Sequence, residues 1–219
     1  MHPAAAAGGC LIGRMVPKRV GGSSRVGIAD ENVQARSPGR LTTGMLLTIG
    51  LVGAVLYAFA NWTTFAIAIP GTDDVSLRPQ FAIVVFIGFA FGPLAGFVAG
   101  FVGNVVGDWL TGFDLLRVWQ WSLANGAVGL LSGIFGAMLV RRVPAGVSRA
   151  IMAGVAGVTA TVLGFLFIWV ELWTQDLSFE FILTREYLPT VVVNSVVAAV
   201  ITPLVVRFWE PLHSFFGEQ

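Results

Sequence analysis

Charge is what this 219-residue chain has least of. Asp, Glu, Lys and Arg make up 11% of it, whereas a soluble domain carries about 25%. Hydrophobic residues make up 56% and gather in long runs, and about 20 such residues suffice to cross a bilayer as a helix. The shortage of charge therefore excludes an ordinary soluble domain and predicts an all-α integral membrane protein.

Residue types that build common reactive sites are also scarce. One cysteine, Cys10, excludes an internal disulfide and a two-cysteine metal site. The single lysine, Lys18, follows a proline, so no G-x-x-x-x-G-K-[ST] phosphate loop exists. No H-E-x-x-H motif occurs, and Ser122 and Ser132 have no base nearby in sequence. We therefore expect neither an enzyme nor a cofactor or metal site, and any ATP used would be bound by another chain.

Six hydrophobic segments predict six transmembrane helices, at 41–59, 79–91, 94–110, 119–140, 149–171 and 188–208. The second is short: as a helix it would be roughly 20 Å long, against a hydrocarbon core of about 30 Å. It either spans the bilayer with its flanks or is re-entrant, and Gly92-Pro93 ends it. The predicted domains are a basic, disordered cytoplasmic tail (1–40), a membrane domain (41–210) and a cytoplasmic C-terminal tail (211–219).

Charge distribution predicts the orientation of the spans. With the N-terminus inside, ten of the 13 Lys and Arg residues fall on the inner side, including six in the tail. The outer side keeps Arg78, Arg117 and Arg185, together with most of the acids of the membrane domain. Because Lys and Arg concentrate on the cytoplasmic side, both termini are predicted to be cytoplasmic, in a bacterial or archaeal plasma membrane.

A polar site is predicted at the outer ends of the helices. The stretch 75–111 carries no charge between Arg78 and Asp108, and Asn104 lies one turn before Asp108 on the same helix face. Six of the seven tryptophans also fall at outer helix ends, where an ordinary interfacial belt is the alternative explanation. A flat ligand with polar edges would suit such aromatic and amide groups. The predicted substrate-binding residues are Asn61, Trp62, Arg78, Asn104, Asp108, Trp119, Gln120, Trp121, Asn125 and Glu171.

The first helix carries a narrow face of small residues. Gly50, Ala54 and Ala58 recur every four residues, a spacing that lets a second helix approach closely. The face could pack inside the chain or dock onto another membrane subunit, and docking is our prediction.

Two motifs resemble a known family. They are R-P-x-x-A (Arg78, Pro79 and Ala82) and F-G-P-x-x-G-F-x-x-G-F-x-G (Phe91 to Gly103), followed by WQWSLANGAVGLLSGIF. Together with GLVGAVLYA in the first helix, they resemble the substrate-binding S components of energy-coupling factor (ECF) vitamin transporters, of the riboflavin-type or uncharacterised group. The resemblance is good over residues 45–140, approximately. The last two helices resemble the family only in their arrangement along the chain, and the long basic tail departs from it.

The resemblance implies a function that composition does not reveal. S components are six-helix proteins that bind a vitamin or related micronutrient at the outer side. They dock through Ala-x-x-x-Ala, here Ala54 and Ala58, onto an EcfT-like transmembrane coupling subunit that carries two ATPases. Riboflavin, a thiamine precursor, cobalamin and a deazapurine remain open as ligands.

Two other functions compete with this prediction. A stand-alone transporter or channel would need an ionisable relay through the bilayer centre, where the sequence offers none. A non-binding membrane scaffold would need the outer tryptophans to face lipid.

Overall fold

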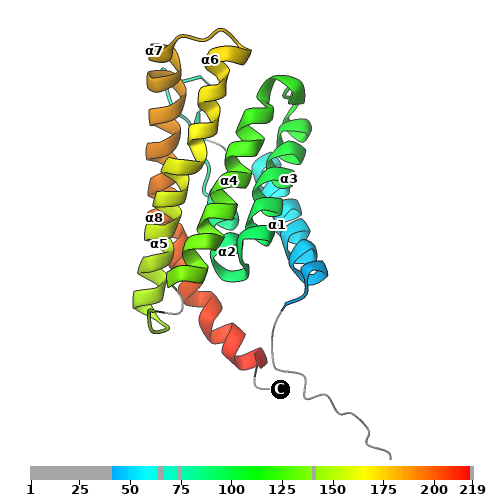
Figure 1. Cartoon of the computed structure of the whole chain (residues 1–219), viewed down its shortest axis with the longest axis vertical. Coiled ribbons are helices and arrows are strands. Elements are labelled where there is room, and N and C mark those ends of the chain that lie inside the picture. Colours follow the sequence, from blue (N-terminus) through cyan, green and yellow to red (C-terminus); the bar gives the residue numbers. More distant parts are fainter. Residues whose placement is uncertain (1–40, 64–66, 74, 140–141, 218–219) are drawn as a thin grey trace, which may run out of the picture. The chain divides into compact units, whose positions relative to one another are not determined.

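The computed structural model describes residues 41–63, 67–73, 75–139 and 142–217. Predictions made for the tail at 1–40, and for Arg141, lie outside the described residues. Six helical segments form a bundle in the described part of the chain (Figure 1). Five of them are long and apolar enough to cross a membrane, and the second is shorter. The predicted all-α membrane fold is confirmed.

The segments follow the hydrophobic pattern closely. They are α1 (Thr43–Thr63), α2 (Phe81–Phe91), α3 (Pro93–Thr111), α4 (Leu115–Leu139), α5 (Val147–Gly164) and α8 (Leu188–Gly217). A 3-10 turn, η1 (Phe165–Val170), and α6 (Glu171–Thr174) continue α5, while α7 (Phe179–Phe181) and a π-helix, η2 (Ile182–Tyr187), lead into α8. Two short strands, β1 (Ile67–Ala68) and β2 (Ser76–Leu77), pair antiparallel between α1 and α2.

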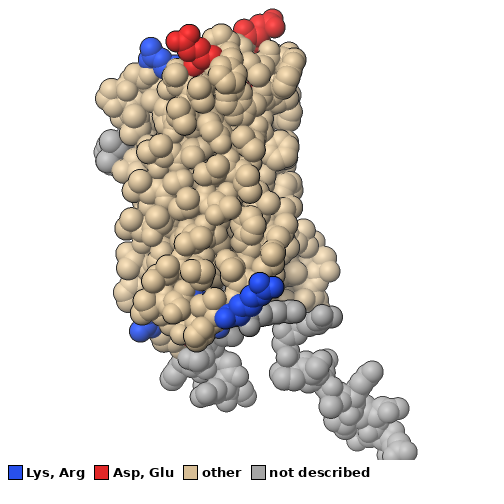
Figure 2. Space-filling model, turned by 60° about the vertical axis from the view of Figure 1, so that its left-hand side comes forward, with Lys and Arg blue, Asp and Glu red and all other residues tan. Residues whose placement is uncertain are grey.

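The bundle has chemically different ends. At the acidic end, defined by Asp114, Asp176 and Glu180, the loops join α3 to α4 and α6 to α7. At the basic end, defined by Arg142, Arg149 and Arg207, α1 begins and α8 ends (Figure 1). Figure 2 shows acidic side chains at one end, basic ones at the other, and an uncharged surface between them, with one basic group beside the acids. An uncharged belt of this kind is suited to a lipid environment.

The short α2 determines where the bundle is hollow. Its 11 residues give a helix of roughly 17 Å, about half the thickness of a bilayer core. It begins inside the bundle and ends at the basic end, where Pro93 opens α3. The volume beyond its first residue, toward the acidic end, is therefore left to side chains of the other helices.

Close helix contacts hold the walls of this volume in place. A β-carbon on Gly96 would overlap the carbonyl oxygen of Gly129, and one on Gly129 would overlap the carbonyl oxygen of Gly96. One turn nearer the acidic end, Gly100 meets the backbone of Asn125 in the same way. Glycine is thus required where the backbones of α3 and α4 touch, as in other membrane helix pairs built on small residues.

The structure corrects the predicted docking surface on α1. Ala54 and Ala58 are each 2% exposed, and Gly50 faces the Ala95 carbonyl and the Val98 side chain of α3. The small face of α1 is therefore buried against α3 of the same chain. Both helices carry small residues at helical spacing, and sequence alone does not say which small faces meet.

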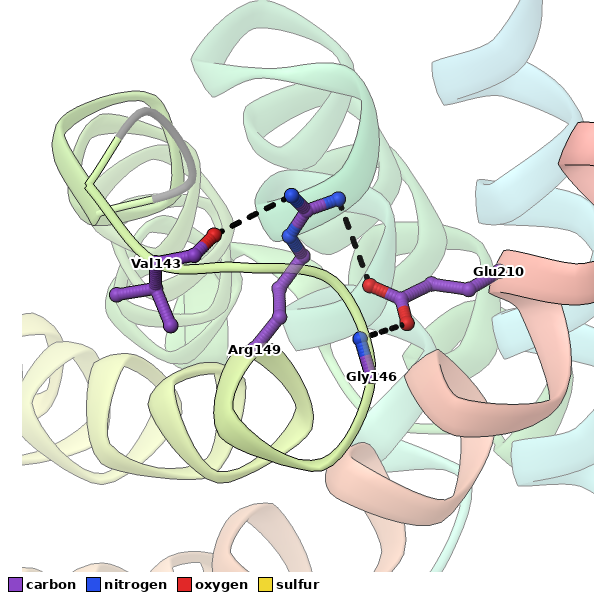
Figure 3. A network of polar contacts seen from close by, with 4 residues as sticks. All are labelled: Val143, Gly146, Arg149 and Glu210. Carbon is purple, nitrogen blue, oxygen red and sulfur yellow. Dashed lines mark hydrogen bonds and ion pairs between the residues drawn. The ribbon is translucent and has the colours of Figure 1, made fainter.

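At the basic end, α8 continues further than the predicted span, to Gly217, and contains Pro203 and Pro211. Its Trp209 packs edge-on against Phe86 in the middle of α2 and Phe91 at its end, with ring centroids 5.7 and 5.5 Å away. Figure 3 shows how the α4–α5 loop is tied to this part of α8. Glu210 accepts a hydrogen bond from the Gly146 amide (2.6 Å) and pairs with Arg149 (3.4 Å), which also donates to the Val143 carbonyl (3.3 Å).

Candidate functional site

A cavity of about 120 Å³ occupies the space beyond the start of α2. Five of the six helical segments (α1, α2, α3, α4 and α8) contribute side chains to its lining. The β1–β2 loop and η1, the turn that continues α5, contribute as well. The lining residues are Tyr57, Asp73, Val75, Ser76, Arg78, Phe81, Asn104, Asp108, Phe113, Val118, Trp121, Asn125, Phe165, Glu186, Thr190 and Asn194.

One side of the cavity, which we call the bonded wall (Tyr57, Asn104, Asp108 and Asn125), is a continuous hydrogen-bond network. Asn104 donates from Nδ2 to Asp108 Oδ2 (2.6 Å) and to Ser122 Oγ (3.1 Å). Asn125 donates to Asn104 Oδ1 (3.2 Å), and the Tyr57 hydroxyl donates to Asn125 Oδ1 (3.4 Å). Buried polar groups that satisfy one another hold fixed orientations, so this wall is rigid without a ligand.

Arg78 supplies the positive charge of the cavity. Its Nε donates to Ser76 Oγ at 3.0 Å, and its guanidinium acts electrostatically on Asp108 and Tyr57 of the bonded wall. Arg117, another arginine near this end, donates to Gln175 Oε1 at 3.5 Å.

Aromatic rings form the apolar part of the lining. Phe165 lies 6.1 Å from Phe81 and 6.1 Å from Trp121, between ring centroids, in tilted and T-shaped arrangements. The indole Nε1 of Trp121 donates to Glu171 Oε1 at 2.9 Å. Gln120 Nε2 donates to the same oxygen, so Glu171 fixes the orientation of Trp121 from behind.

The opposite side of the cavity, which we call the open wall (Glu186, Thr190 and Asn194), comes from η2 and α8. These residues follow one another every four positions and share one helix face. The β1–β2 loop is fastened beside them. Arg185 donates to the Gly71 carbonyl, and the Asp73 amide donates to the Arg185 carbonyl at 3.1 Å. The loop thereby places Asp73 at the cavity next to the open wall.

The structure brings five of the ten predicted site residues to the cavity: Arg78, Asn104, Asp108, Trp121 and Asn125. Gln120 and Glu171 form the buried layer behind Trp121. Asn61 lies further away and accepts a hydrogen bond from Gln80 Nε2 at 3.1 Å.

Trp62 and Trp119 are not part of the cavity lining; they are 55% and 43% exposed. Trp119 and Trp121 are two residues apart on a helix, roughly 200° around its axis. One of them therefore faces the bundle while the other faces outward. Exposed tryptophans at helix ends are typical of a membrane interface.

Eleven lining residues were not among the predicted site residues, and the polar ones include Tyr57, Asp73, Glu186, Thr190 and Asn194. A signal for the open wall existed in the sequence, because Glu186, Thr190 and Asn194 recur every four residues in an otherwise apolar segment. Tyr57 and Phe165 carried none, since an aromatic residue in a membrane helix is equally consistent with packing against lipid or protein.

Comparison with known proteins supports this architecture. The family model described as "ECF-type riboflavin transporter, S component" matches residues 40–209. UPF0397 proteins of Aliivibrio salmonicida and Vibrio atlanticus are each 33% identical over 96 residues, or 43% of this chain and 50% of theirs. A UPF0397 protein of Aliivibrio fischeri is 32% identical over the same length.

The chain thus spans about half the length of the curated relatives that it matches. No solved structure matches it. The family match nevertheless covers the bundle as far as residue 209 of α8, including the motifs that surround the cavity. The chain belongs to the S components of ECF-type riboflavin transporters, the family of substrate-binding membrane subunits.

Proposed function

We propose that this protein binds a vitamin-sized molecule in the cavity and delivers it across the membrane as part of an ECF transporter. The observation that carries the proposal is the cavity itself, which is polar on two sides, aromatic on a third and enclosed by membrane helices. Buried polar groups are costly inside a membrane protein and mark substrate pathways. A packing-only scaffold would gain nothing from such a hollow.

Direct contacts with the ligand are assigned to the residues that line the cavity. Arg78, Asn104, Asp108 and Asn125 would orient polar edges, and Trp121 would stack on a flat ring. Glu171 and Gln120 would act through Trp121 by holding its indole. Riboflavin, named in the family description, offers both a flat ring and polar edges.

The acidic end is proposed to face the outside of a bacterial or archaeal plasma membrane, with both termini in the cytoplasm. The excess of Lys and Arg at the basic end and in the N-terminal tail supports this orientation. The cavity lies in the half of the bundle nearer the acidic end, so the ligand would enter from outside.

ATP hydrolysis is assigned to separate subunits. The sequence has no phosphate loop, so an EcfT-like coupling subunit with two ATPases would supply the energy. We place the contact with the coupling subunit on a face other than the small face of α1, because that face is buried against α3.

The test is to purify the full chain in lipid nanodiscs and identify any released small molecule by mass spectrometry. Calorimetric titration with a panel of vitamins, riboflavin included, then measures affinity and stoichiometry. One ligand per chain with micromolar affinity or better is expected, along with quenching of tryptophan fluorescence. A protein that carries nothing and binds no member of the panel would exclude a binding function.

A further inference from the structure

The open wall carries three buried oxygen atoms that point to a ligand. Glu186, Thr190 and Asn194 are 3%, 4% and 8% exposed. Among the described residues, Glu186 Oε2, Thr190 Oγ1 and Asn194 Oδ1 have no hydrogen-bond partner. Each such group destabilises the protein while it stays unsatisfied. All three line the cavity, so a ligand with matching groups would remove that destabilisation.

The backbone around Glu186 is unusual as well. Residues Ile182–Tyr187 form the π-helix η2 between α7 and α8. Short π segments inside α-helices are rare and are frequent at functional sites. Here the π segment carries Glu186 at the start of the open wall, one turn before Thr190.

The electrostatic neighbours of Glu186 are acids. Its carboxyl group lies close enough to those of Glu171 and Asp73 to interact with both. The three arginines at this end bond to other groups: Arg78 Nε donates to Ser76 beside the bonded wall, Arg117 donates to Gln175, and Arg185 donates to the Gly71 carbonyl. Carboxyl groups so close together repel one another when ionised, and a positively charged ligand would offset that repulsion and hold Glu186 in its ionised form.

We infer that the ligand carries a positively charged nitrogen group and that the open wall binds it, with Glu186 as the anionic partner. Thr190 and Asn194 would accept further hydrogen bonds from the same end of the ligand. The aromatic rings of Trp121, Phe81 and Phe165 beside this wall suit a cation, since ring faces attract positive charge. The ligand class is therefore a heteroaromatic cation.

A metal ion fits this wall less well than an organic cation. Within the described ranges, no group of three acidic, cysteine or histidine side chains is arranged to hold a metal. The aromatic rings beside the open wall also provide contact area that a bare ion would not use.

The inference rests on the proposed function, and its test separates the two. The full chain in nanodiscs is titrated with two heteroaromatic cations, thiamine and N1-methylnicotinamide. The neutral probes are riboflavin and nicotinamide, and nicotinamide differs from N1-methylnicotinamide by one methyl group and one charge. We expect at least one cation to bind at least tenfold more tightly than either neutral probe.

The variant Glu186→Gln keeps the shape of the side chain and removes its negative charge. It should weaken cation binding by at least tenfold, because hydrogen bonds to charged groups are the stronger ones. Glu180→Gln is the matched control: it makes the same change on an exposed residue of the same segment, outside the cavity. Its affinity should equal that of the unchanged protein.

Three results would overturn the inference. If riboflavin binds at least as tightly as both cations, the ligand is not a cation, but the proposed binding function still holds. Unchanged cation affinity in Glu186→Gln would mean that the carboxyl group is not the anionic partner. Failure of all four probes, with no released molecule, would remove the binding function as well.

Discussion

The two polar walls of the cavity contrast in how their groups are satisfied. In the bonded wall, the amides of Asn104 and Asn125 are bonded to neighbours on α1, α3 and α4. In the open wall, three oxygen atoms of similar burial have no partner among the described residues. A satisfied network stabilises the empty protein, whereas unsatisfied groups destabilise it until a ligand arrives. The bonded wall therefore fixes the shape of the cavity, whereas the open wall is stabilised when a ligand binds.

The most severe way to break this arrangement is to separate α3 from α4. Gly129→Leu would place a side chain where the Gly96 carbonyl now lies, costing roughly 4 kcal/mol or more because backbone has to move. We expect loss of the monodisperse peak in size-exclusion chromatography and of cooperative thermal unfolding. Gly44→Leu, at an exposed site with open space around it, should behave normally. A well-folded Gly129→Leu protein would contradict the close packing.

Removing the centre of the bonded wall should damage both stability and binding. Asn104→Leu takes away the donor to Asp108 and Ser122 and the acceptor of Asn125. We expect a loss of roughly 2–3 kcal/mol, because buried partners are left unsatisfied. Thermal unfolding without ligand and calorimetric titration would measure the two effects. A variant that loses affinity but unfolds at the original temperature would argue against a supporting role for this wall.

A matched pair of hydroxyl deletions compares the walls directly. Ser122→Ala removes a bonded hydroxyl and should lower stability by about 1 kcal/mol. Thr190→Val removes a buried, unbonded hydroxyl at nearly constant volume, and should leave the empty protein as stable or more stable. The measurement is the midpoint of thermal unfolding in the absence of ligand. Equal losses in both variants would abolish the distinction between the walls.

The smallest effect is expected far from the cavity. Glu210→Gln removes the ion pair with Arg149 at the basic end, where both side chains are partly exposed. Such pairs contribute about 0.5 kcal/mol or less after solvent screening, so a slight drop in unfolding temperature is expected. Ligand affinity should not change, and a change would show that the two ends of the bundle are coupled.

Much of the fold could be predicted from the hydrophobic pattern. The six segments, the short second helix and the break at Gly92-Pro93 follow from run length and from the chemistry of proline. The start of α4 was misplaced by four residues, since Leu115 to Val118 lie at an interface where apolar and polar residues mix. For the described residues, the charge distribution along the sequence also predicted correctly which loops lie at the acidic end of the bundle and which lie at the basic end.

The cavity was only half predictable. Asn104 and Asp108 share a helix face with flanking glycines, a pattern that marks a buried polar site. Tyr57 and Phe165 carried no such mark, because their side chains line the cavity only through the way α1 and η1 pack. Glu186 was assigned to the outer loop region, since no sequence rule predicts that a π-helix will begin the last span inside the bundle.

The sequence by itself determined that this chain is a membrane bundle with a short second helix, opposite charge at its two ends and no means of binding ATP through a phosphate loop. Run length, charge and motif are local properties, so they can be read along the chain. Only the tertiary structure decided that the small face of α1 is buried and that Trp121, not Trp119, reaches the cavity. It also decided that one polar wall is bonded while the other is open, because pairing between helices distant in sequence depends on their packing.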